Sequence, residues 1–530
     1  MKKIIKRVNV NLVGRFLPLL LILPIYIILY KIYAPKVNAF GCFDDCFNIV
    51  AGYFIVSGKK LYSEIFFNHQ PLMAYLSFII QKIYSPINIY ELVLVHRQSL
   101  MAFSFIMNAL MVLRFGLPML GFVFLYEFSK FYVFGDRFLA EGVVVYPLVY
   151  MVCLVWQKYT SKRLHWYDYM LSVLFAWFVM FMREPYIIIS FFLFFLIFFG
   201  KPFSYFKKIA LGLFILLVIF FLAFLPIPDY FFNVVTVNGQ ILRSEGVENN
   251  LLGQGAVKLF IYPILILFGG EWNIFRYFLV GLDLIFLISF LFLLKIERNR
   301  RILVMLFLIL GLANIRIVPP GKIFYAAFHM IVWYGLFIAT VTLLLRELFL
   351  YKKKIASLLL IILIILFIYI VGSPKSFVRE RVDPHYEFIT NYGKELQVGE
   401  VVRLLSKPTD TLYLDGADDL IYWQAKRLSP YKYSWYTSGM PRFSRYRQAR
   451  LDMFATSPPD FYYRFCTKEI VPDYFLPKAY ENDYQNIHSA GKSTCLYVKK
   501  SKLENIQEER WKKAKEFFYE LPNNAKIKYR

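Results

Sequence analysis

Apolar stretches of membrane-spanning length follow one another through the first 372 residues of this 530-residue chain, and the remaining residues are more polar. A helix needs ~20 apolar residues to cross the hydrocarbon core of a bilayer. The pattern therefore predicts about eleven transmembrane helices. Their expected ranges are 15–34, 71–86, 99–127, 138–157, 166–182, 185–199, 208–226, 277–294, 302–318, 322–345 and 355–372.

One further apolar segment, "LFIYPILILFGG" (259–270), is interpreted differently. If it were counted as a span, the basic loop "KIERNRR" would move to the opposite side of the membrane, away from the other basic loops. We therefore expect this segment to form a helix that lies at the outer interface of the membrane or dips into it.

Lysine and arginine gather between the apolar stretches and set the orientation of the predicted helices. The start "MKKIIKRVNV" and the loops "KYTSKR", "GKPFSYFKK", "KIERNRR" and "YKKK" all fall in the cytoplasm, as short basic loops of membrane proteins do. The first apolar run is expected to be a retained span, because it is long for a signal peptide and no convincing cleavage site follows it. A first external loop, 35–70, then faces outward.

The hydropathy falls after residue 372, so the chain is expected to divide into a transmembrane module, 1–372, and an external C-terminal domain, 373–530. Alternating segments such as "DTLYLDG" and "STCLYVKK" are typical of short strands and predict a small α/β domain. Between them, "IYWQAKRLSPYKYSWY" is rich in aromatic residues. They would form the core of this domain or, less commonly, contact a sugar.

Composition agrees with a membrane protein and narrows the function. The chain is 58% hydrophobic and 20% aromatic, with a mean hydropathy of +0.51, values that exclude an ordinary soluble protein. Much of the net charge of +25 comes from the basic loops, and no nucleic-acid-binding module accompanies it. The sequence has no phosphate-binding glycine loop and no zinc-type cysteine and histidine spacing. No cofactor or metal site is predicted, and dependence on a divalent metal stays open.

The first external loop carries a combination of polar residues that a simple connection does not need. "FDD" ends at Asp45, "GKKLYSE" ends at Glu64, and "NHQPL" contains His69. In order and spacing this loop resembles that of GT-C glycosyltransferases, especially the bacterial and archaeal relatives of protein O-mannosyltransferases and aminoarabinose transferases. Glu64 stands where the family often has Asp, and Gln70 stands where Pro or Lys is frequent.

The resemblance implies transfer of a sugar from a polyprenyl-phosphate donor to a hydroxyl of a glycan, lipid or protein, at the outer face of the cytoplasmic membrane. It makes Asp44 the base of an inverting displacement. Asp45 would orient Asp44, raise its pKa or contact the acceptor. His69 would bind the donor phosphate or position Asp44, and Glu64 belongs to the same donor region. The structural alternatives are a helix cap for the aspartates and an interfacial side chain for His69.

A lipid phosphate needs cations near the membrane surface, and three are candidates: Arg183, Arg316 and Lys322. Arg183 interrupts an apolar stretch in "MFMREPYIII". A charged residue at membrane depth is energetically costly, so its presence indicates a functional role. Its structural alternative is an ion pair with Glu184 or with a partner elsewhere in the bundle. Arg316 and Lys322 would bind the phosphate or extend to lipid headgroups. Arg243, in an exposed loop, is a weaker candidate.

The five cysteines leave their redox state open. Cys153 lies within a predicted span and is expected to pack there. Cys42 with Cys46, and Cys466 with Cys495, could form disulfides in an oxidising compartment. Free thiols are equally compatible with the sequence.

Two alternatives to a glycosyltransferase remain. Another enzyme of lipid-linked glycans, such as a ligase or polymerase, would be expected to use external arginines and a large late loop. A transporter or flippase would be expected to place charged residues at the membrane midplane and to contain repeated halves. The sequence shows no internal repeat.

Overall fold

A computed structural model describes residues 2–37, 41, 44–160, 164–199, 205–240, 255–268, 271–314, 325–415, 420–434, 443–464, 477–517 and 519–520. The chain forms two compact units. The helical unit consists of Met1–Val37, Arg97–Leu225 and Leu242–Asp383, and the mixed unit consists of Asn38–His96, Pro226–Ile241 and Pro384–Arg530. The first loop and a segment from the middle of the chain thus belong with the C-terminal residues.

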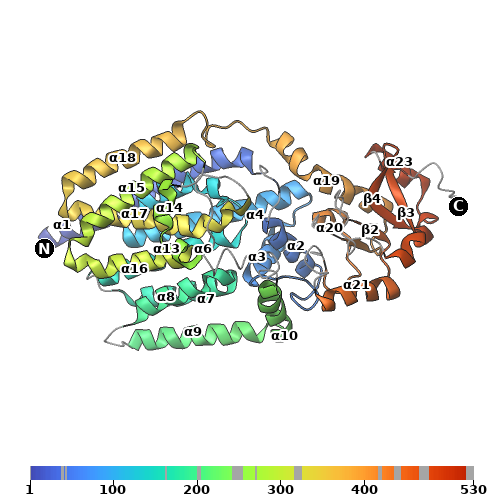
Figure 1. The fold of residues 1–530 in the computed structure, drawn as a ribbon, viewed down its shortest axis with the longest axis horizontal. Coiled ribbons are helices and arrows are strands. Elements are labelled where there is room, and N and C mark those ends of the chain that lie inside the picture. The colour runs from blue at the N-terminus through green and yellow to red at the C-terminus, as the bar shows by residue number, and fades with distance from the viewer. Residues whose placement is uncertain are drawn as a thin grey trace. The chain divides into compact units, whose positions relative to one another are not determined.

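The helical unit is built from helices that lie side by side (Figure 1). Its helices are α1 (Lys2–Tyr33), α4 (Ile89–Phe115), α5 (Leu117–Glu127), α6 (Ala140–Tyr159), α7 (Trp166–Met182), α8 (Ile187–Phe198), α9 (Tyr205–Ala223), α13 (Gly255–Phe260), α14 (Tyr262–Phe268), α15 (Ile274–Leu294), α16 (Glu297–Ala313), α17 (Ile331–Tyr351) and α18 (Lys353–Gly372). The first turns of α4, up to His96, belong to the mixed unit.

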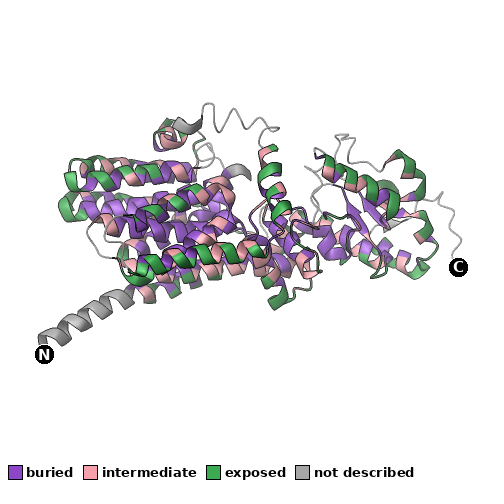
Figure 2. Cartoon of the chain, turned by 90° about the horizontal axis from the view of Figure 1, so that it is seen from below, coloured by how far each residue is buried: buried purple, intermediate pink, exposed green. Residues whose placement is uncertain are grey.

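Helices α6 and α17 form the centre of the helical unit. The most apolar 18-residue stretch is buried entirely in α6 and to 94% in α17, but only to 17% in α9 and 22% in α18. Figure 2 shows the buried positions along the interior of this bundle. Apart from Tyr369, the exposed large hydrophobic side chains of α18 are aliphatic, for example Leu358, Ile361 and Ile365. An apolar exterior around an apolar interior is the arrangement that a lipid environment favours.

Among the described residues, seven helices are long and apolar enough to cross a membrane. They are Pro18–Lys36, Ile89–Phe115, Ala140–Tyr159, Tyr205–Ala223, Ile274–Leu294, Ala327–Tyr351 and Lys353–Gly372. Each overlaps a predicted span, so a helical protein with several membrane-spanning segments is supported. The predicted span 99–127 is divided by Gly116, whose φ of +79° ends α4 before α5 begins.

The count of eleven spans is not confirmed. The segments expected at 166–182 and 185–199 form the shorter helices α7 and α8, and the helix at 302–318 is α16, whose first turns are highly charged. The segment expected to span at 71–86 forms α3 (Leu72–Tyr84), which belongs to the mixed unit. Its 13 residues extend ~20 Å, less than the ~30 Å hydrocarbon core. Segment 259–270, expected as one interfacial helix, contains the end of α13 and all of α14.

Where it is described, the mixed unit combines helices, most of them short, with a five-stranded sheet. Its helices are α2 (Asp44–Val56), α3, α10 (Ile227–Phe231) with its π-helical continuation Phe232–Val237, α19 (Pro384–Leu405), α20 (Leu420–Ala425), α21 (Ser444–Thr456), α22 (Lys500–Leu503) and α23 (Glu508–Glu516). Its strands are β1 (Leu412–Leu414), β2 (Phe461–Tyr463), β3 (Tyr484–Ser489), β4 (Lys492–Lys499) and β5 (Tyr519–Glu520).

The sheet confirms the small α/β domain that the alternating segments predict. The strand order is β1-β2-β4-β3-β5, with β1 and β2 parallel and the other pairs antiparallel. "DTLYLDG" contains β1 and "STCLYVKK" lies in β4. The two-residue turn between β3 and β4, Ala490 and Gly491, has positive φ at both positions, as a tight hairpin requires.

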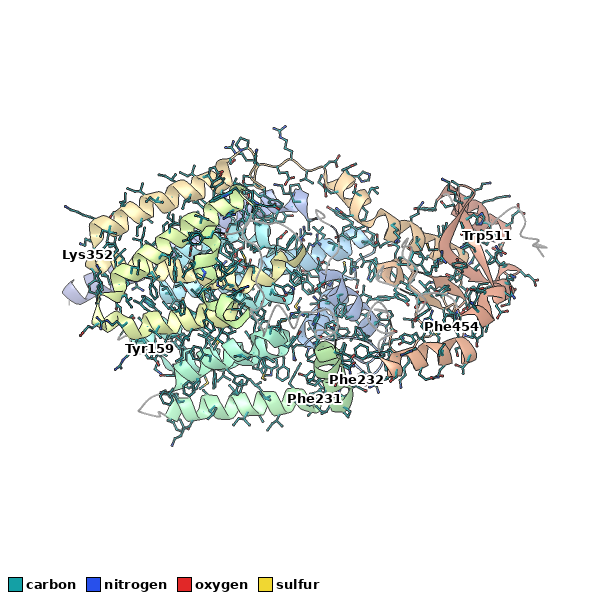
Figure 3. All side chains as sticks on the ribbon, in the orientation of Figure 1. Tyr159, Phe231, Phe232, Lys352, Phe454 and Trp511 are labelled. Carbon is teal, nitrogen blue, oxygen red and sulfur yellow. The ribbon has the colours of Figure 1, made fainter. Side chains whose placement is uncertain are left out.

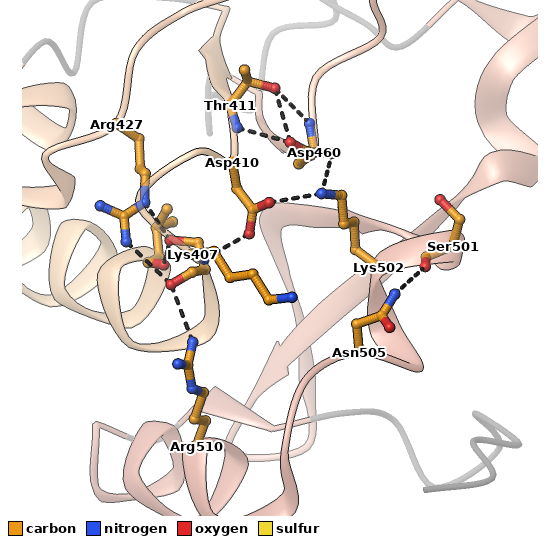
Figure 4. Close-up of polar contacts among 11 residues, drawn as sticks. Lys407, Asp410, Thr411, Arg427, Asp460, Ser501, Lys502, Asn505 and Arg510 are labelled. Atoms are coloured by element: carbon orange, nitrogen blue, oxygen red, sulfur yellow. Dashed lines mark hydrogen bonds and ion pairs between the residues drawn. The ribbon is translucent and has the colours of Figure 1, made fainter. Parts of the chain in front are cut away.

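A polar cluster joins the beginnings of β1 and β2 to α22 (Figure 4). The ammonium of Lys502 lies 2.7 Å from the Asp410 carboxylate and 3.3 Å from that of Asp460. Asp460 also accepts a hydrogen bond from the Thr411 amide at 2.9 Å. Burial acts to raise the pKa of Asp410, but hydrogen bonds from Lys502 and the Lys407 amide outweigh it and lower the pKa.

Asp410→Asn is expected to destabilise the mixed unit by ~1–2 kcal/mol at pH 7, because it weakens hydrogen bonds to a charged group. A carboxyl with a lowered pKa stabilises the fold above its unfolded pKa and ceases to do so as the pH falls through its folded pKa. The difference in unfolding temperature between the wild type and the variant should therefore shrink below about pH 4. A difference that stays constant from pH 7 to pH 3 would contradict this role for the charge.

Candidate active site

The two adjacent aspartates lie in the first turn of α2. Asp44 is the first residue of this helix and is half-buried, whereas Asp45 is fully buried. The N-terminus of a helix carries a partial positive charge and unpaired amides, which stabilise carboxylates. The Asp44 carbonyl accepts a hydrogen bond from the Asn48 side chain at 3.2 Å. Both side chains therefore begin the helix at its positive end, a position compatible with a structural role and with a reactive one.

His69 lies against the same helix. Its ring packs edge-on against Phe47 of α2, with ring centres 5.3 Å apart, and against Phe67 at 6.0 Å. Phe47 is one helical turn beyond Asp44. The His69 carbonyl accepts a hydrogen bond from the Tyr62 hydroxyl at 2.8 Å. The fold therefore brings together the parts of the loop that carry the aspartates and the histidine.

Glu64 has a local structural role in the described loop. Its carboxylate accepts a hydrogen bond from the Lys60 amide at 2.8 Å, and its own amide donates to the Lys60 carbonyl at 2.9 Å. These bonds close a turn that begins just after Gly58, whose φ of +91° ends α2. Glycine adopts this left-handed conformation without strain. A contribution of Glu64 to donor binding stays a prediction.

Tyr62 fixes the middle of the loop in an uncommon conformation. Its φ is +68°, a region that bulky residues rarely enter. Its side chain is fully buried and packs edge-on against Tyr230, with ring centres 5.3 Å apart. The Asn233 side chain donates to the Tyr62 carbonyl at 3.4 Å. Tertiary contacts thus stabilise this turn and, through the Tyr62 hydroxyl, the backbone at His69.

The segment 226–240, for which the sequence pattern predicted no role, hydrogen-bonds to the first loop at several points. Asp229 accepts from the Ser63 hydroxyl at 2.8 Å, and the Tyr230 hydroxyl donates to Gln70 at 2.9 Å. Asn238 exchanges hydrogen bonds with Asn68, at 2.8 and 2.6 Å. The local signal in the sequence was weak: polar residues are scattered among apolar ones in "PDYFFNVVTVN" (228–238).

Helix α21 holds this segment from the C-terminal side. Arg445 pairs with the Asp229 carboxylate at 2.5 Å and donates to the Tyr433 hydroxyl at 2.8 Å. The Tyr446 hydroxyl donates to Asn233 at 2.7 Å. Burial acts to raise the pKa of Asp229, but hydrogen bonds from Arg445 and from the Ser63 hydroxyl outweigh it and lower the pKa.

Lys59 makes a second link between the first loop and the C-terminal residues. Its ammonium donates to the carbonyls of Ser429 and Tyr431, both at 3.2 Å, and to the Ser434 hydroxyl. All three acceptor residues are buried. Burial lowers the pKa of Lys59 to about 8, although the Glu64 carboxylate opposes this change.

The aromatic residues of the C-terminal domain form its core where the structure describes them. Tyr422, Trp423, Tyr431 and Tyr433 are all at most 5% exposed. Tyr431 and Tyr433 pack edge-on against each other, with ring centres 6.0 Å apart. This supports the structural interpretation of "IYWQAKRLSPYKYSWY" for residues up to 434. Its last two residues, Trp435 and Tyr436, lie outside the described residues.

Arg183 belongs to the helical unit and has carboxylate partners there. Its guanidinium lies 2.9 Å from Glu141 of α6 and 3.6 Å from the adjacent Glu184. Arg183 is buried and ends α7. A buried arginine needs such partners to offset the loss of hydration. The structural alternative for Arg183 thus has a geometric basis, and a role in phosphate binding stays a prediction.

The other predicted cations, Arg316, Lys322 and the weaker candidate Arg243, lie outside the described residues. Cys46 and Cys495 are each disulfide-bonded. Their expected partners, Cys42 and Cys466, are also outside the described part of the chain. Cys153 is free and buried in α6, as expected for packing. Within the described ranges no group of three or more histidine, cysteine, aspartate or glutamate residues is arranged to hold a metal ion.

A scan against models of known protein families found no match to this chain, and a search of curated proteins found no significant match. The motif of the first loop and the contacts that hold this loop are therefore the features that point to a function.

Proposed function

We propose that this chain is a membrane glycosyltransferase of the GT-C type, which uses a polyprenyl-phosphate-linked sugar at the outer face of the cytoplasmic membrane. The observation that carries the proposal is the position of His69 against the helix that begins with Asp44 and Asp45. The motif that resembles this family is thus one local cluster in a protein whose described part includes seven helices of membrane-spanning character.

In the proposed reaction the Asp44 carboxylate takes the proton of the acceptor hydroxyl as its oxygen attacks the anomeric carbon. The bond between this carbon and the phosphate oxygen breaks, and the lipid phosphate leaves with the electron pair. The anomeric configuration inverts in this single displacement. Asp44 suits the role because it is the more accessible of the two aspartates.

Asp45 and His69 are proposed to support this step. Asp45 is fully buried next to Asp44, so we assign it to positioning the first turn of α2 rather than to contact with the acceptor. His69 is half-exposed and is proposed to donate a hydrogen bond to the departing phosphate or to position Asp44. A cationic side chain that contacts the departing phosphate would stabilise the negative charge that develops on it.

Binding of the lipid phosphate is proposed to depend chiefly on Arg316 and Lys322. The ion pairs of Arg183 with Glu141 and Glu184 make it a less suitable ligand, since those pairs would have to loosen for it to bind. Arginine can bind phosphate oxygens with two parallel hydrogen bonds, and lysine acts as a compact charge. Whether a divalent metal assists is decided by measuring transfer with and without a chelator.

The decisive experiment incubates the purified protein with a panel of polyprenyl-phosphate hexoses and pentoses and measures release of the polyprenyl phosphate. We expect at least one donor to be consumed by the wild type and spared by Asp44→Asn. Consumption at the same rate by both proteins would exclude Asp44 as the base. If no donor is consumed, the ligase or polymerase alternative is tested with polyprenyl-diphosphate glycans.

One observation favours a second function, transport coupled to protons or cations. Asp283 lies near the middle of α15 and is fully buried, and neither carboxyl oxygen has a hydrogen-bond partner among the described residues. Ionisable residues inside a membrane often mark transport pathways. The glycosyltransferase needs no such residue.

Asp283→Asn should therefore leave sugar transfer within about twofold of the wild type, a difference below ~0.5 kcal/mol in activation free energy. The two functions separate here, because a transporter that uses this carboxyl would lose uptake into vesicles in the same variant. Donor consumption and solute uptake are measured in one reconstituted preparation. Loss of donor consumption with retained unfolding temperature would contradict the expectation.

A further inference from the structure

The exposed large hydrophobic residues of the mixed unit are concentrated in three segments. Among its described residues there are eleven: Ile79, Ile83, Tyr84, Ile87, Ile227, Phe231, Val235, Tyr386, Ile389, Leu428 and Leu451. All but Leu428 and Leu451 lie shortly before α4 or shortly after α9 or α18. These three helices are candidate membrane spans.

Helix α3 buries polar residues and exposes apolar ones, the reverse of the arrangement in a water-soluble protein. Its buried side is partly polar: Ser77 hydrogen-bonds His96 at 2.8 Å, and Gln81 donates to the Ile49 carbonyl of α2 at 2.8 Å. Its free side and the residues just after it are apolar, with Ile83 71% and Ile87 76% exposed. A helix in water buries its apolar face and exposes its polar one.

Helix α3 is too short to span the membrane, but its short connection to α4 allows it to contact lipid. Its 13 residues are too few to cross a bilayer. The candidate span α4 begins at Ile89, and only four residues separate it from the end of α3 at Tyr84. The short connection therefore keeps the apolar side of α3 close to the point where α4 would enter the membrane. A short amphipathic helix in this situation lies in the interface plane.

The second segment repeats this arrangement next to α9. Ile227, Phe231 and Val235 are exposed at a spacing of four residues, so they form one stripe, while Tyr230, Asn233 and Val234 are buried against the loop and α21. Figure 3 labels the adjacent residues Phe231 and Phe232. Phe231 is exposed, whereas Phe232 packs on Tyr446 with ring centres 5.8 Å apart. This stripe begins four residues after the end of α9 at Ala223.

The third segment is the beginning of α19, with Tyr386 67% and Ile389 47% exposed. Phe388, between them, packs edge-on against Tyr90 of α4, with ring centres 5.6 Å apart. The beginnings of α19 and α4 therefore lie together within the mixed unit. This contact lies three residues after Ile87 of the first segment and between Tyr386 and Ile389 of the third.

We propose that these three segments form a lipid-binding base, with which the mixed unit lies on the interfacial region of the bilayer. The occupant is lipid rather than a partner protein, because each segment is joined through the backbone to a candidate span. Exposed Lys82 at the edge of α3 is suited to reach headgroup phosphates. The inference does not depend on the reaction that the protein catalyses.

The test measures the environment of single spin labels on the full-length protein, with one copy in each lipid nanodisc and the native disulfides intact. Labels replace Ile79, Ile83, Ile87, Phe231 and Ile389, and the matched controls replace Leu428 and Leu451, which are exposed and apolar but distant in sequence from the spans. Accessibility is measured to oxygen, which enters lipid, and to a nickel chelate, which stays in water.

We expect the five test positions to favour oxygen over the chelate by a ratio several times that of the two controls. Equal ratios at test and control positions would place these side chains in water and overturn the proposal. Protection from both reagents would show that protein covers the segments, and this outcome also overturns it. Because every substituted residue is exposed, the fold should survive labelling, which the unfolding temperature checks.

Discussion

Asp44→Asn should reduce sugar transfer by ~10²–10⁴-fold, the contribution of a positioned general base. Asparagine keeps the size of the side chain but cannot accept the proton of the acceptor hydroxyl. Because Asp44 is only half-buried at the beginning of α2, the fold and donor binding should persist. The measurements are initial transfer rate, donor affinity and unfolding temperature.

Asp45→Asn is the matched control, because it removes the same charge from the neighbouring, fully buried position. We expect a smaller loss of turnover than for Asp44→Asn, accompanied by a lower unfolding temperature. If the two variants lose turnover equally while remaining stable, the base is not assigned to Asp44 alone. Near wild-type turnover of Asp44→Asn would remove this residue from the mechanism.

Lys59→Met should give the second largest effect, a loss of ~1–3 kcal/mol in the stability of the mixed unit. The substitution leaves two buried carbonyls and a buried hydroxyl without the ammonium that they contact, and buried polar groups that lose a partner are costly. Turnover should fall as well, because α2, which carries Asp44, ends near Lys59. Lys60→Met is the control, since Lys60 is an exposed neighbour.

The stability difference between the wild type and Lys59→Met should depend on pH in a direction set by the lowered pKa of Lys59. Burial lowers the pKa of Lys59 to about 8, below the ordinary value of ~10.4. Between these two values the unfolded chain binds more protons than the folded one, so the folded state gains stability as the pH rises. The stability of the wild type relative to Lys59→Met should increase from pH 8 to pH 10. A decrease over this range would contradict the burial of a charged ammonium.

Local sequence pattern was sufficient for the spans with ~20 apolar residues, such as α6 and α15, because length and hydropathy determine them. It failed for α3, since "PLMAYLSFIIQKIYSP" is apolar enough to resemble the beginning of a span. The left-handed Ser85, with φ of 45°, ends this helix at Tyr84. The polar inner face of α3 was visible in Ser77 and Gln81, but without α2 it had no interpretation.

The candidate site also contains one part that the sequence pattern could predict and another that it could not. Asp44, Asp45 and His69 lie within one short stretch, so their spacing could be recognised in the sequence. The contacts that hold this stretch join residues far apart along the chain, as in the pair of Asp229 with Arg445 and the bonds of Lys59 to residues 429–434. No local pattern encodes such pairs. The partner of Arg183 in α6 was foreseen only as an unspecified alternative.

The mixed unit is assembled from three separate stretches of chain, and this imposes an order on biogenesis. The first stretch ends at His96 and the last begins at Pro384, so at ~5–20 residues per second the ribosome needs roughly 15–60 s to make the intervening part. During that time the stretch that carries Asp44 lacks the partners of Lys59, which lie at 429–434. In the proposed membrane enzyme the later spans are therefore inserted before this stretch can reach its final structure, so that transfer activity would report complete and correct membrane insertion.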